Sequence, residues 1–376
     1  MSLFDMILAA IIIVLFVSYA SLILYYWRSW TAIPLFQWNG TSPSTMISVI
    51  IPARNEAENI GLLLQSLKAQ SYPAHLFEII VVDDHSTDLT VDIARSFAGV
   101  RLVQFTIGPS NSYKKMALDA GVRFATGELI VTTDADCHCH TDWLSTLAAL
   151  YEKDKPVFIA APVSIDRSGS LVGLFQDFDF AILQGITGGS VHRQFHSMCN
   201  GANLAYTRQA FESVNGFSGI DDIASGDDML LMHKIWKQFP GRISYLKSKE
   251  AIVSTQPMRT WQAFFKQRIR WASKATRFDD KRITAVLLLV YFFNISFLVL
   301  AVAGFYQHDY WWLALILWIA KTIIEWPFMD SITRFFNKRY LVAWFFFLQP
   351  IHIAYTILSG LFGQFGKYEW KGRKVK

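Results

Sequence analysis

Charged residues and cysteines are both scarce in this chain. Of its 376 residues, only 17% are charged and 52% are hydrophobic, which is more apolar than a soluble protein usually is. The three cysteines, Cys137, Cys139 and Cys199, all lie between the apolar ends of the chain, and so few cysteines suit a reducing cytosol. No basic stripe interleaved with aromatic residues is present, so nucleic acid is a poor candidate partner.

Four long apolar segments account for the hydrophobic excess. Residues 8–27 carry no charge, and their length fits one helical crossing of a bilayer. No small-residue cleavage site follows them, so we expect residues 1–28 to be a transmembrane anchor rather than a cleaved signal peptide. The other three candidate spans form a C-terminal membrane region, 284–364, and are residues 285–306, 310–329 and 340–363.

Basic residues near the spans predict their orientation. Arg28 follows the first span and only Asp5 precedes it, so the domain after this span should be cytosolic, as at a bacterial inner membrane or its equivalent. The last span contains Pro350, which removes a helix hydrogen bond. We therefore expect a broken or re-entrant segment that returns the basic tail, 365–376, to the cytosol.

Residues 46–255 alternate short apolar runs with helical patterns. The runs "ISVII", "EIIVV", "RLVQF" and "ELIV" are continuous, as in strands that are buried on both faces. Strands that alternate with helices indicate parallel βαβ units, so the predicted fold class is α/β. Polar residues follow three of these strands, in "PARNE", "DDHSTD" and "TDADC". Ligands bind at the carboxyl ends of the strands in such sheets.

Two carboxylates, Asp134 and Asp136, flank one alanine after the fourth strand. Close carboxylates repel one another unless a cation separates them. Mg²⁺ or Mn²⁺ takes oxygen ligands and commonly uses one or two carboxylates together with substrate phosphates. The pair therefore suggests a divalent metal that holds a diphosphate, although an isolated Asp-x-Asp is more often a solvated turn.

Seven motifs in one order carry a resemblance to a known family. They are "VIIPARNEAENI", "VVDDHSTD", "KKMAL", "TTDADC", "NGANLAYTRQAFESVNGF", "SGDDMLL" and "QRIRW". The chain resembles family 2 glycosyltransferases of the GT-A fold. It is similar to the integral-membrane branch with the Gln-x-x-Arg-Trp motif, which includes ceramide-glucosyltransferase-like and polysaccharide-synthase enzymes. The resemblance implies a Rossmann-like mixed sheet, a nucleotide-sugar donor and a divalent metal, Mg²⁺ or Mn²⁺.

The resemblance also implies roles for individual residues. Lys114 would meet the donor diphosphate, with its neighbour Lys115 as the rival, and Asp134 and Asp136 would hold the metal. The residues implied to bind the uridine of a UDP-sugar are Pro52, Arg54, Glu56, Asp83 and Asp84, without a decision between the two aspartates.

"SGDDMLL" corresponds to the family's Glu-Asp motif, with Asp227 in place of the glutamate. Asp228 matches the catalytic base, which an inverting transfer requires because the acceptor hydroxyl loses its proton as it attacks. The alternative explanation is that both carboxylates stabilise a helix N-terminus that Ser225 caps.

"QRIRW" falls in a predicted amphipathic interface helix, 256–280. Trp261, Phe264, Phe265, Ile269 and Ala272 share an apolar face that suits a membrane interface. The opposite face would contribute to donor and acceptor contacts, and it carries Gln267, Arg270, Trp271 and Lys274.

We therefore expect a membrane-bound inverting glycosyltransferase that adds sugar to a lipid or other membrane-embedded hydroxyl on the cytosolic face. A processive polysaccharide synthase shares every motif and is the main alternative, and a catalytically inactive membrane scaffold is a weaker one. Lys321 and Glu325 lie inside a span, where charges often mark transport, but their spacing also allows them to pair across one helical turn. The sugar, the acceptor and the oligomeric state do not follow from the sequence.

Overall fold

The structure is a computed structural model that describes residues 3–105, 112–223, 226–273, 280–365, 368–370 and 373–375. Its chain divides into two compact units, a helical unit and a sheet unit. The helical unit comprises Met1–Ala32, Arg167–Gly189 and Pro257–Gly366. The sheet unit comprises Ile33–Asp166, Ser190–Gln256 and Lys367–Lys376.

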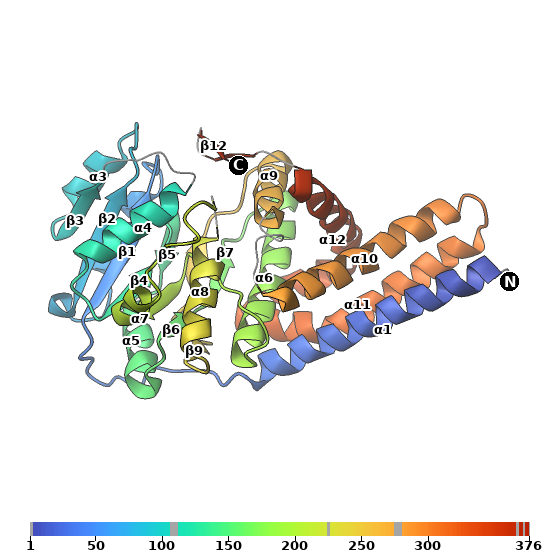
Figure 1. The fold of residues 1–376 in the computed structure, drawn as a ribbon, viewed down its shortest axis with the longest axis horizontal. Helices are drawn as coiled ribbons and strands as arrows, with labels where there is room; N and C mark the ends of the chain where they lie inside the picture. Colours follow the sequence, from blue (N-terminus) through green and yellow to red (C-terminus); the bar gives the residue numbers. More distant parts are fainter. Residues whose placement is uncertain are drawn as a thin grey trace. The chain divides into compact units, whose positions relative to one another are not determined.

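A seven-stranded mixed sheet forms the centre of the sheet unit (Figure 1). The strand order is β3-β2-β1-β4-β8-β6-β9; β1 to β4 are parallel, and β8 is antiparallel to β4 and β6. These strands are β1 Ile47–Ala53, β2 Phe77–Asp83, β3 Val100–Gln104, β4 Leu129–Thr132, β6 Phe158–Ala160, β8 Leu204–Thr207 and β9 Ile243–Tyr245. A three-stranded sheet contains β5 Cys137–Cys139, β10 Val253–Thr255 and β7 Val163–Ile165, and a further pair is β11 Tyr368–Trp370 and β12 Arg373–Val375.

Helices pack against the large sheet through apolar faces that the sequence pattern predicts. In α2, the four residues at helical spacing are all completely buried: Ile60, Leu63, Leu64 and Leu67. In α4, Gly121 allows close approach to β1, because a Cβ there would lie 2.5 Å from the Ile50 side chain. The helices of this unit are α2 Ile60–Lys68, η1 Ala74–Leu76, α3 Thr90–Ser96, α4 Tyr113–Phe124, α5 Trp143–Asp154, α7 Arg208–Ser213 and α8 Asp227–Gln238.

The carboxyl ends of β1, β2 and β4 meet at one edge of the sheet. Ala53, the last residue of β1, pairs in register with Asp83, the last residue of β2. On the other side of β1, Ile50 pairs with Thr132 at the end of β4. The three polar loops that follow these strands therefore lie beside one another, as the sequence predicts.

Long apolar helices form the helical unit. Within the described residues, four of them have the length and hydropathy of membrane spans, one N-terminal and three C-terminal, which agrees with the predicted number and order. Helices α1, α10 and α11 run alongside one another in Figure 1. The helices of this unit are α1 Leu3–Ala32, α6 Leu171–His192 up to Gly189, α9 Trp261–Ala272, α10 Lys281–Ala303, α11 Asp309–Phe335 and α12 Tyr340–Phe365.

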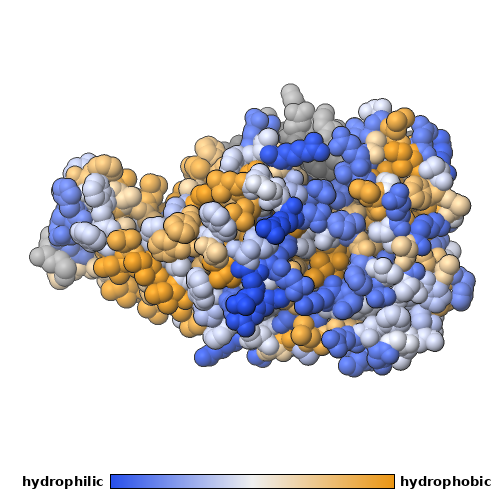
Figure 2. Space-filling view, turned by 180° about the vertical axis from the view of Figure 1, so that it is seen from behind, coloured by the Kyte–Doolittle hydropathy of each residue, from blue (hydrophilic) through white to orange (hydrophobic). Residues whose placement is uncertain are grey.

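The outer surface of the long helices is apolar. Figure 2 shows hydrophobic residues gathered there, and large exposed side chains include Val14 on α1, Phe292 on α10 and Ile316 on α11. Exposed side chains of this kind and number are unfavourable in water and favourable in lipid. The helical unit therefore has the surface of a membrane protein.

Polar residues are paired inside the helical unit. Lys321 donates a hydrogen bond to Glu325 at 2.7 Å, which confirms the predicted pairing across one turn. Gln349 of α12 and Tyr19 of α1 both donate to the same carboxylate. Buried charges are tolerated when they are paired and hydrogen-bonded, and this network joins three helices.

The predicted break at Pro350 is wrong. Helix α12 is continuous from Tyr340 to Phe365, although Pro350 lies in its interior. A proline removes only one helix hydrogen bond, and buried residues before and after Pro350 along the helix, among them Phe345 and Ser359, keep it packed. At 26 residues, α12 is long enough for a complete crossing. The broken segment that was to return the basic tail to the cytosol is therefore absent.

Candidate functional site

Lys114 joins two acidic segments of the sheet unit. Its ammonium lies 2.6 Å from a carboxylate oxygen of Asp134, just after β4, and 3.2 Å from one of Asp227, at the start of α8. Burial alone would lower the pKa of Lys114, but the negative charges of Asp134, Asp227 and nearby Asp228 outweigh it, so the pKa is raised. Lys114 therefore stays charged and holds the two loops together.

Gly201 brings a backbone N–H to this cluster. It donates to Asp228 Oδ2 at 3.0 Å, and a Cβ at position 201 would lie 3.1 Å from Asp227 Oδ2 and 3.3 Å from Lys114 Nζ. Glycine is therefore the residue that fits here without displacing its neighbours. The side chain of Asn203 fixes the same loop, because its amide donates to Pro162 O and its oxygen accepts from Trp143 Nε1.

The Asp134–Asp136 motif forms a turn between β4 and β5. The backbone N–H of Cys137 donates to Asp134 O at 3.2 Å, and both carboxylates are partly exposed. Burial and the charges of Asp136 and Asp134 raise the pKa of the Cys137 thiol, so this cysteine remains a neutral packing residue beside the turn.

The loops after β1 and β2 are tied together. Arg54 donates to the carbonyl oxygens of Asp84 at 2.6 Å and His85 at 3.2 Å, and the Glu56 N–H donates to Thr90 Oγ1. Asp83 uses both carboxylate oxygens within the protein, one accepting from Ser86 N and the other from Gln104 Nε2. Asp83 and Asp84 are only 2% and 3% exposed. These loops therefore form a preorganised rim of the sheet edge.

Lys115, the alternative to Lys114 as the lysine that meets the diphosphate, lies in a different environment. Lys115 is 2% exposed, and its ammonium donates to Ile220 O and Ile223 O, each at 2.6 Å. Ile220 and Ile223 belong to the loop that leads to α8. The adjacent lysines of α4 therefore contact different segments, Lys114 the acidic cluster and Lys115 the backbone of this loop.

We predict that Lys115→Met destabilises the protein, because two partly buried carbonyls lose a charged donor. The expected loss is about 1.5–3 kcal/mol in the free energy of unfolding, the range for hydrogen bonds to charged groups. Thermal melting of the purified protein in detergent measures it. Lys68→Met, at an exposed position in the last turn of α2, is the control and should melt like the wild type. Equal melting of both variants would contradict the role of Lys115.

Helix α9 packs on protein through its apolar face. Phe264 is completely buried in a cluster with Phe175 of α6 and Phe345 of α12, and Trp261 and Phe265 pack against this cluster. The expectation that this face lies on lipid is therefore wrong for Phe264. The cause is α6, whose apolar residues cover it and which the sequence did not reveal as a long helix.

Arg268, inside the "QRIRW" motif, is a buried charge that sequence reasoning missed. Its guanidinium lies 2.6 Å from Asp179 of α6 and 4.2 Å from the centre of the Trp271 ring. Tyr355 of α12 donates to the same aspartate at 2.7 Å. The ion pair and the cation–π contact fix the orientation of Trp271. The signal in the sequence was two aspartates, Asp177 and Asp179, in the mostly apolar run "FQDFDFAIL".

The structure brings some of the predicted site residues together. Lys114, Asp134, Asp227 and Asp228 form one cluster, which we call the acidic cluster, and Asp136 follows in the same turn. Arg54, Glu56, Asp83 and Asp84 line the adjoining loops, and Pro52 lies within β1. Gln267, Arg270 and Trp271 lie on α9 of the helical unit. Ser225 and Lys274 fall outside the described residues.

Sequence comparisons identify relatives of the sheet unit. Residues 48–214 match the profile of the family described as "Glycosyl transferase family 2". The probable glycosyltransferase YdaM of Bacillus subtilis is 26% identical over 67% of this chain and 62% of its own length. The dodecaprenyl-phosphate galacturonate synthase of Rhizobium johnstonii is 35% identical over 28% of this chain and 32% of its own length. The chain thus spans less than two thirds of either relative.

A solved structure shares the fold along nearly the whole chain. It is the mannosyltransferase PcManGT from Pyrobaculum calidifontis, determined in complex with GDP-Man and Mn²⁺, with a TM-score of 0.60 and 22% identity. The match covers 94% of this chain and 99% of that protein. The comparison confirms the predicted GT-A fold with its mixed sheet. Together, the profile match and the relatives support a family 2 glycosyltransferase.

Proposed function

We propose that this chain is a membrane-bound, inverting family 2 glycosyltransferase. It would move a sugar from a nucleoside-diphosphate sugar, a UDP-sugar, to the hydroxyl of a lipid on the cytosolic face of the membrane. The observation that carries the proposal is the acidic cluster. Lys114, Asp134, Asp227 and Asp228 meet at the carboxyl edge of a sheet whose sequence matches this family.

The acidic cluster supports separate roles for its members. Asp228 sits in the first turn of α8, where Gly201 fixes one carboxylate oxygen, and it acts as the base that takes the acceptor proton. Asp227 supports it from the same turn and holds Lys114. The positive charge of Lys114 would stabilise the negative charge that develops on the donor diphosphate as the sugar leaves.

The rim loops would receive the nucleoside. Asp83 and Asp84 both lie at this rim and are both proposed to contact the base, and the two carboxylate oxygens of Asp83 accept hydrogen bonds from Ser86 N and Gln104 Nε2. Arg54 and Glu56 brace the adjoining loop after β1, and Pro52 is the residue before the end of β1.

Asp134 and Asp136 fit a divalent metal by their chemistry. Carboxylate oxygens are the ligands that Mg²⁺ and Mn²⁺ prefer, and one or two of them suffice when substrate phosphates complete the shell. In the described part of the chain, no group of three or more histidine, cysteine or acidic side chains is arranged for a metal. Bound there, the ion would neutralise charge on the departing diphosphate.

The acceptor is proposed to be a lipid because the chain carries four apolar helices of membrane-spanning length. The name of the Rhizobium relative refers to a lipid phosphate, which supports a lipid as the acceptor. On α9, Arg270 would add positive charge for the leaving group, and Gln267 and Trp271 would contact donor and acceptor. The guanidinium of Arg268 packs against the face of the Trp271 ring.

The test of the proposal is transfer by the purified full-length protein in lipid nanodiscs, supplied with radiolabelled UDP-sugars and a membrane lipid extract. We expect one or a few sugars on a product that partitions into organic solvent. A long water-soluble polymer would establish the processive synthase instead. Absence of both transfer and nucleotide-sugar hydrolysis with every donor would support the inactive scaffold.

A further inference from the structure

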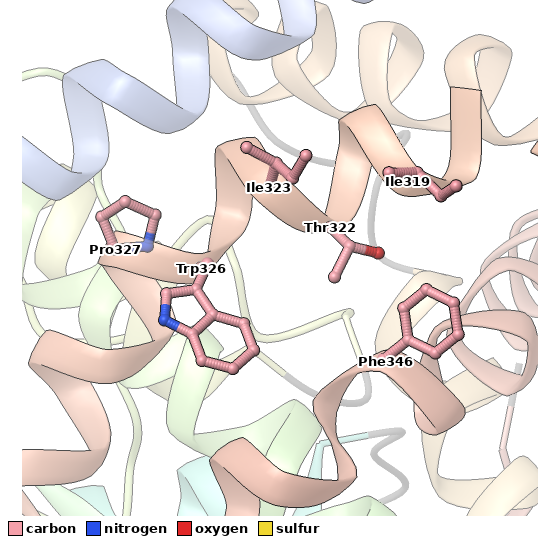
Figure 3. A pocket seen from close by; sticks show the side chains of 6 residues that line it. All are labelled: Ile319, Thr322, Ile323, Trp326, Pro327 and Phe346. Atoms are coloured by element: carbon pink, nitrogen blue, oxygen red, sulfur yellow. The ribbon is translucent and has the colours of Figure 1, made fainter. Parts of the chain in front are cut away.

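An apolar groove lies between α11 and α12 of the helical unit. It encloses about 360 Å³. Its lining comes from five residues of α11 and one of α12, and Figure 3 shows these side chains around the open space: Ile319, Thr322, Ile323, Trp326, Pro327 and Phe346. Ile323 is 66% exposed and Trp326 is 45% exposed, so the groove opens on the outer surface of the long helices.

Charged residues continue the same face of α11 beyond the groove. Residues 319, 323, 326, 330 and 334 follow at steps of three and four, so Asp330 and Arg334 lie on the stripe that lines the groove. Arg334 Nη2 lies 2.6 Å from Asp330, and Arg339, just before α12, approaches the same carboxylate at 3.8 Å. These two arginines, 62% and 68% exposed, therefore share one negative charge.

Other charges nearby do not cancel the surplus. Lys338 pairs with the buried Asp177 of α6, and Tyr340 donates to the same carboxylate. The guanidinium of Arg167 lies 4.5 Å from the centre of the Tyr340 ring. Among the described residues at this corner, three basic side chains thus pair with two carboxylates, and Arg334 and Arg339 are the exposed members.

The spacing fits the depth of one bilayer leaflet. At 1.5 Å per residue, Pro327 lies about 10 Å and Ile319 about 22 Å along the helix from Arg334. Half of a bilayer's hydrocarbon core is about 15 Å thick, and its headgroup region adds about 6 Å. With Arg334 at headgroup level, the groove lies in the hydrocarbon of the same leaflet and ends near the midplane.

We propose that this corner and groove bind one anionic phospholipid of the surrounding membrane. Its phosphate contacts Arg334 and Arg339, and one acyl chain lies in the groove beside Ile323, Trp326 and Phe346. Charge complementarity selects the headgroup, and the apolar lining holds the chain. The proposal concerns a structural lipid and stands whether or not the protein transfers sugar.

Native mass spectrometry of the full-length protein in mild detergent tests the site. The protein is incubated with equal amounts of phosphatidylglycerol and phosphatidylcholine that carry identical acyl chains. The wild type should bind more phosphatidylglycerol than phosphatidylcholine. In the double variant Arg334→Gln, Arg339→Gln, the ratio of bound phosphatidylglycerol to bound phosphatidylcholine should fall at least about tenfold. Ile319→Trp, which narrows the groove, should reduce retention of both lipids.

The matched control is Arg123→Gln. Arg123 also forms an exposed i, i+4 pair, with Asp119 at 2.8 Å, but on α4 of the sheet unit. It should leave the lipid preference unchanged. Equal retention of the two lipids by the wild type would overturn the proposal, as would an unchanged preference in the Arg334/Arg339 variant. Thermal melting of each variant verifies that the protein is folded.

Discussion

Replacing Asp228 with asparagine is expected to lower the rate of sugar transfer by about a thousandfold while nucleotide-sugar affinity changes little. Asparagine keeps the size of the side chain and can still accept from Gly201 N, but it cannot take a proton. General base catalysis contributes about 10² to 10⁴ in rate. Transfer rates and calorimetric titration with UDP-sugar measure the two quantities separately.

The control for Asp228→Asn is Asp92→Asn. Asp92 is exposed and also lies in the first turn of a helix, α3, so it reproduces any effect of removing a negative charge from a helix N-terminus. It should retain full activity. A loss of donor binding in Asp228→Asn would instead assign this carboxylate to the donor site.

Removal of divalent metal is expected to abolish transfer, and addition of Mn²⁺ or Mg²⁺ should restore it. Asp136→Asn should reduce the rate at least about 10²-fold, the scale of losing an electrostatic stabiliser. Asp136 is a sharper probe than Asp134, because replacing Asp134 also breaks the ion pair with Lys114. Binding of Mn²⁺ to the protein with UDP, followed by electron paramagnetic resonance, gives a readout that does not depend on turnover.

Asp154→Asn is the matched substitution for the metal test, since Asp154 is exposed at the end of α5, within the sheet unit. It should bind Mn²⁺ and transfer sugar like the wild type. Full activity of the EDTA-treated protein, or unchanged Mn²⁺ binding by Asp136→Asn, would remove the metal from the account.

The sequence predicts the fold well where periodicity is strong. The apolar spans, the parallel strands and the buried face of α2 all follow from runs and spacings of apolar residues. It fails at α6, because a helix that is apolar on several faces shows no clear stripe. It also fails at Pro350, where tertiary packing outweighs the helix-breaking tendency of proline.

The site is predictable in part for a similar reason. Residues at the ends of parallel strands converge by topology, so the sequence already groups Asp84 with Asp134. Topology does not predict which of two adjacent residues contacts a given partner. The roles of Lys114 and Lys115 could therefore be assigned only from their contacts in the structure. The Arg268–Asp179 pair joins residues far apart in the chain, and periodicity does not predict such a contact.

Mass spectrometry of membrane lipids tests the central claim most directly. Lipids are extracted from cells that produce the wild type, from cells that produce Asp228→Asn at equal level, and from cells without the protein. The account predicts a lipid carrying one or a few added sugars in the wild-type membranes alone. The same glycolipid in cells that produce Asp228→Asn, or lipid profiles that do not differ among the three, would contradict it.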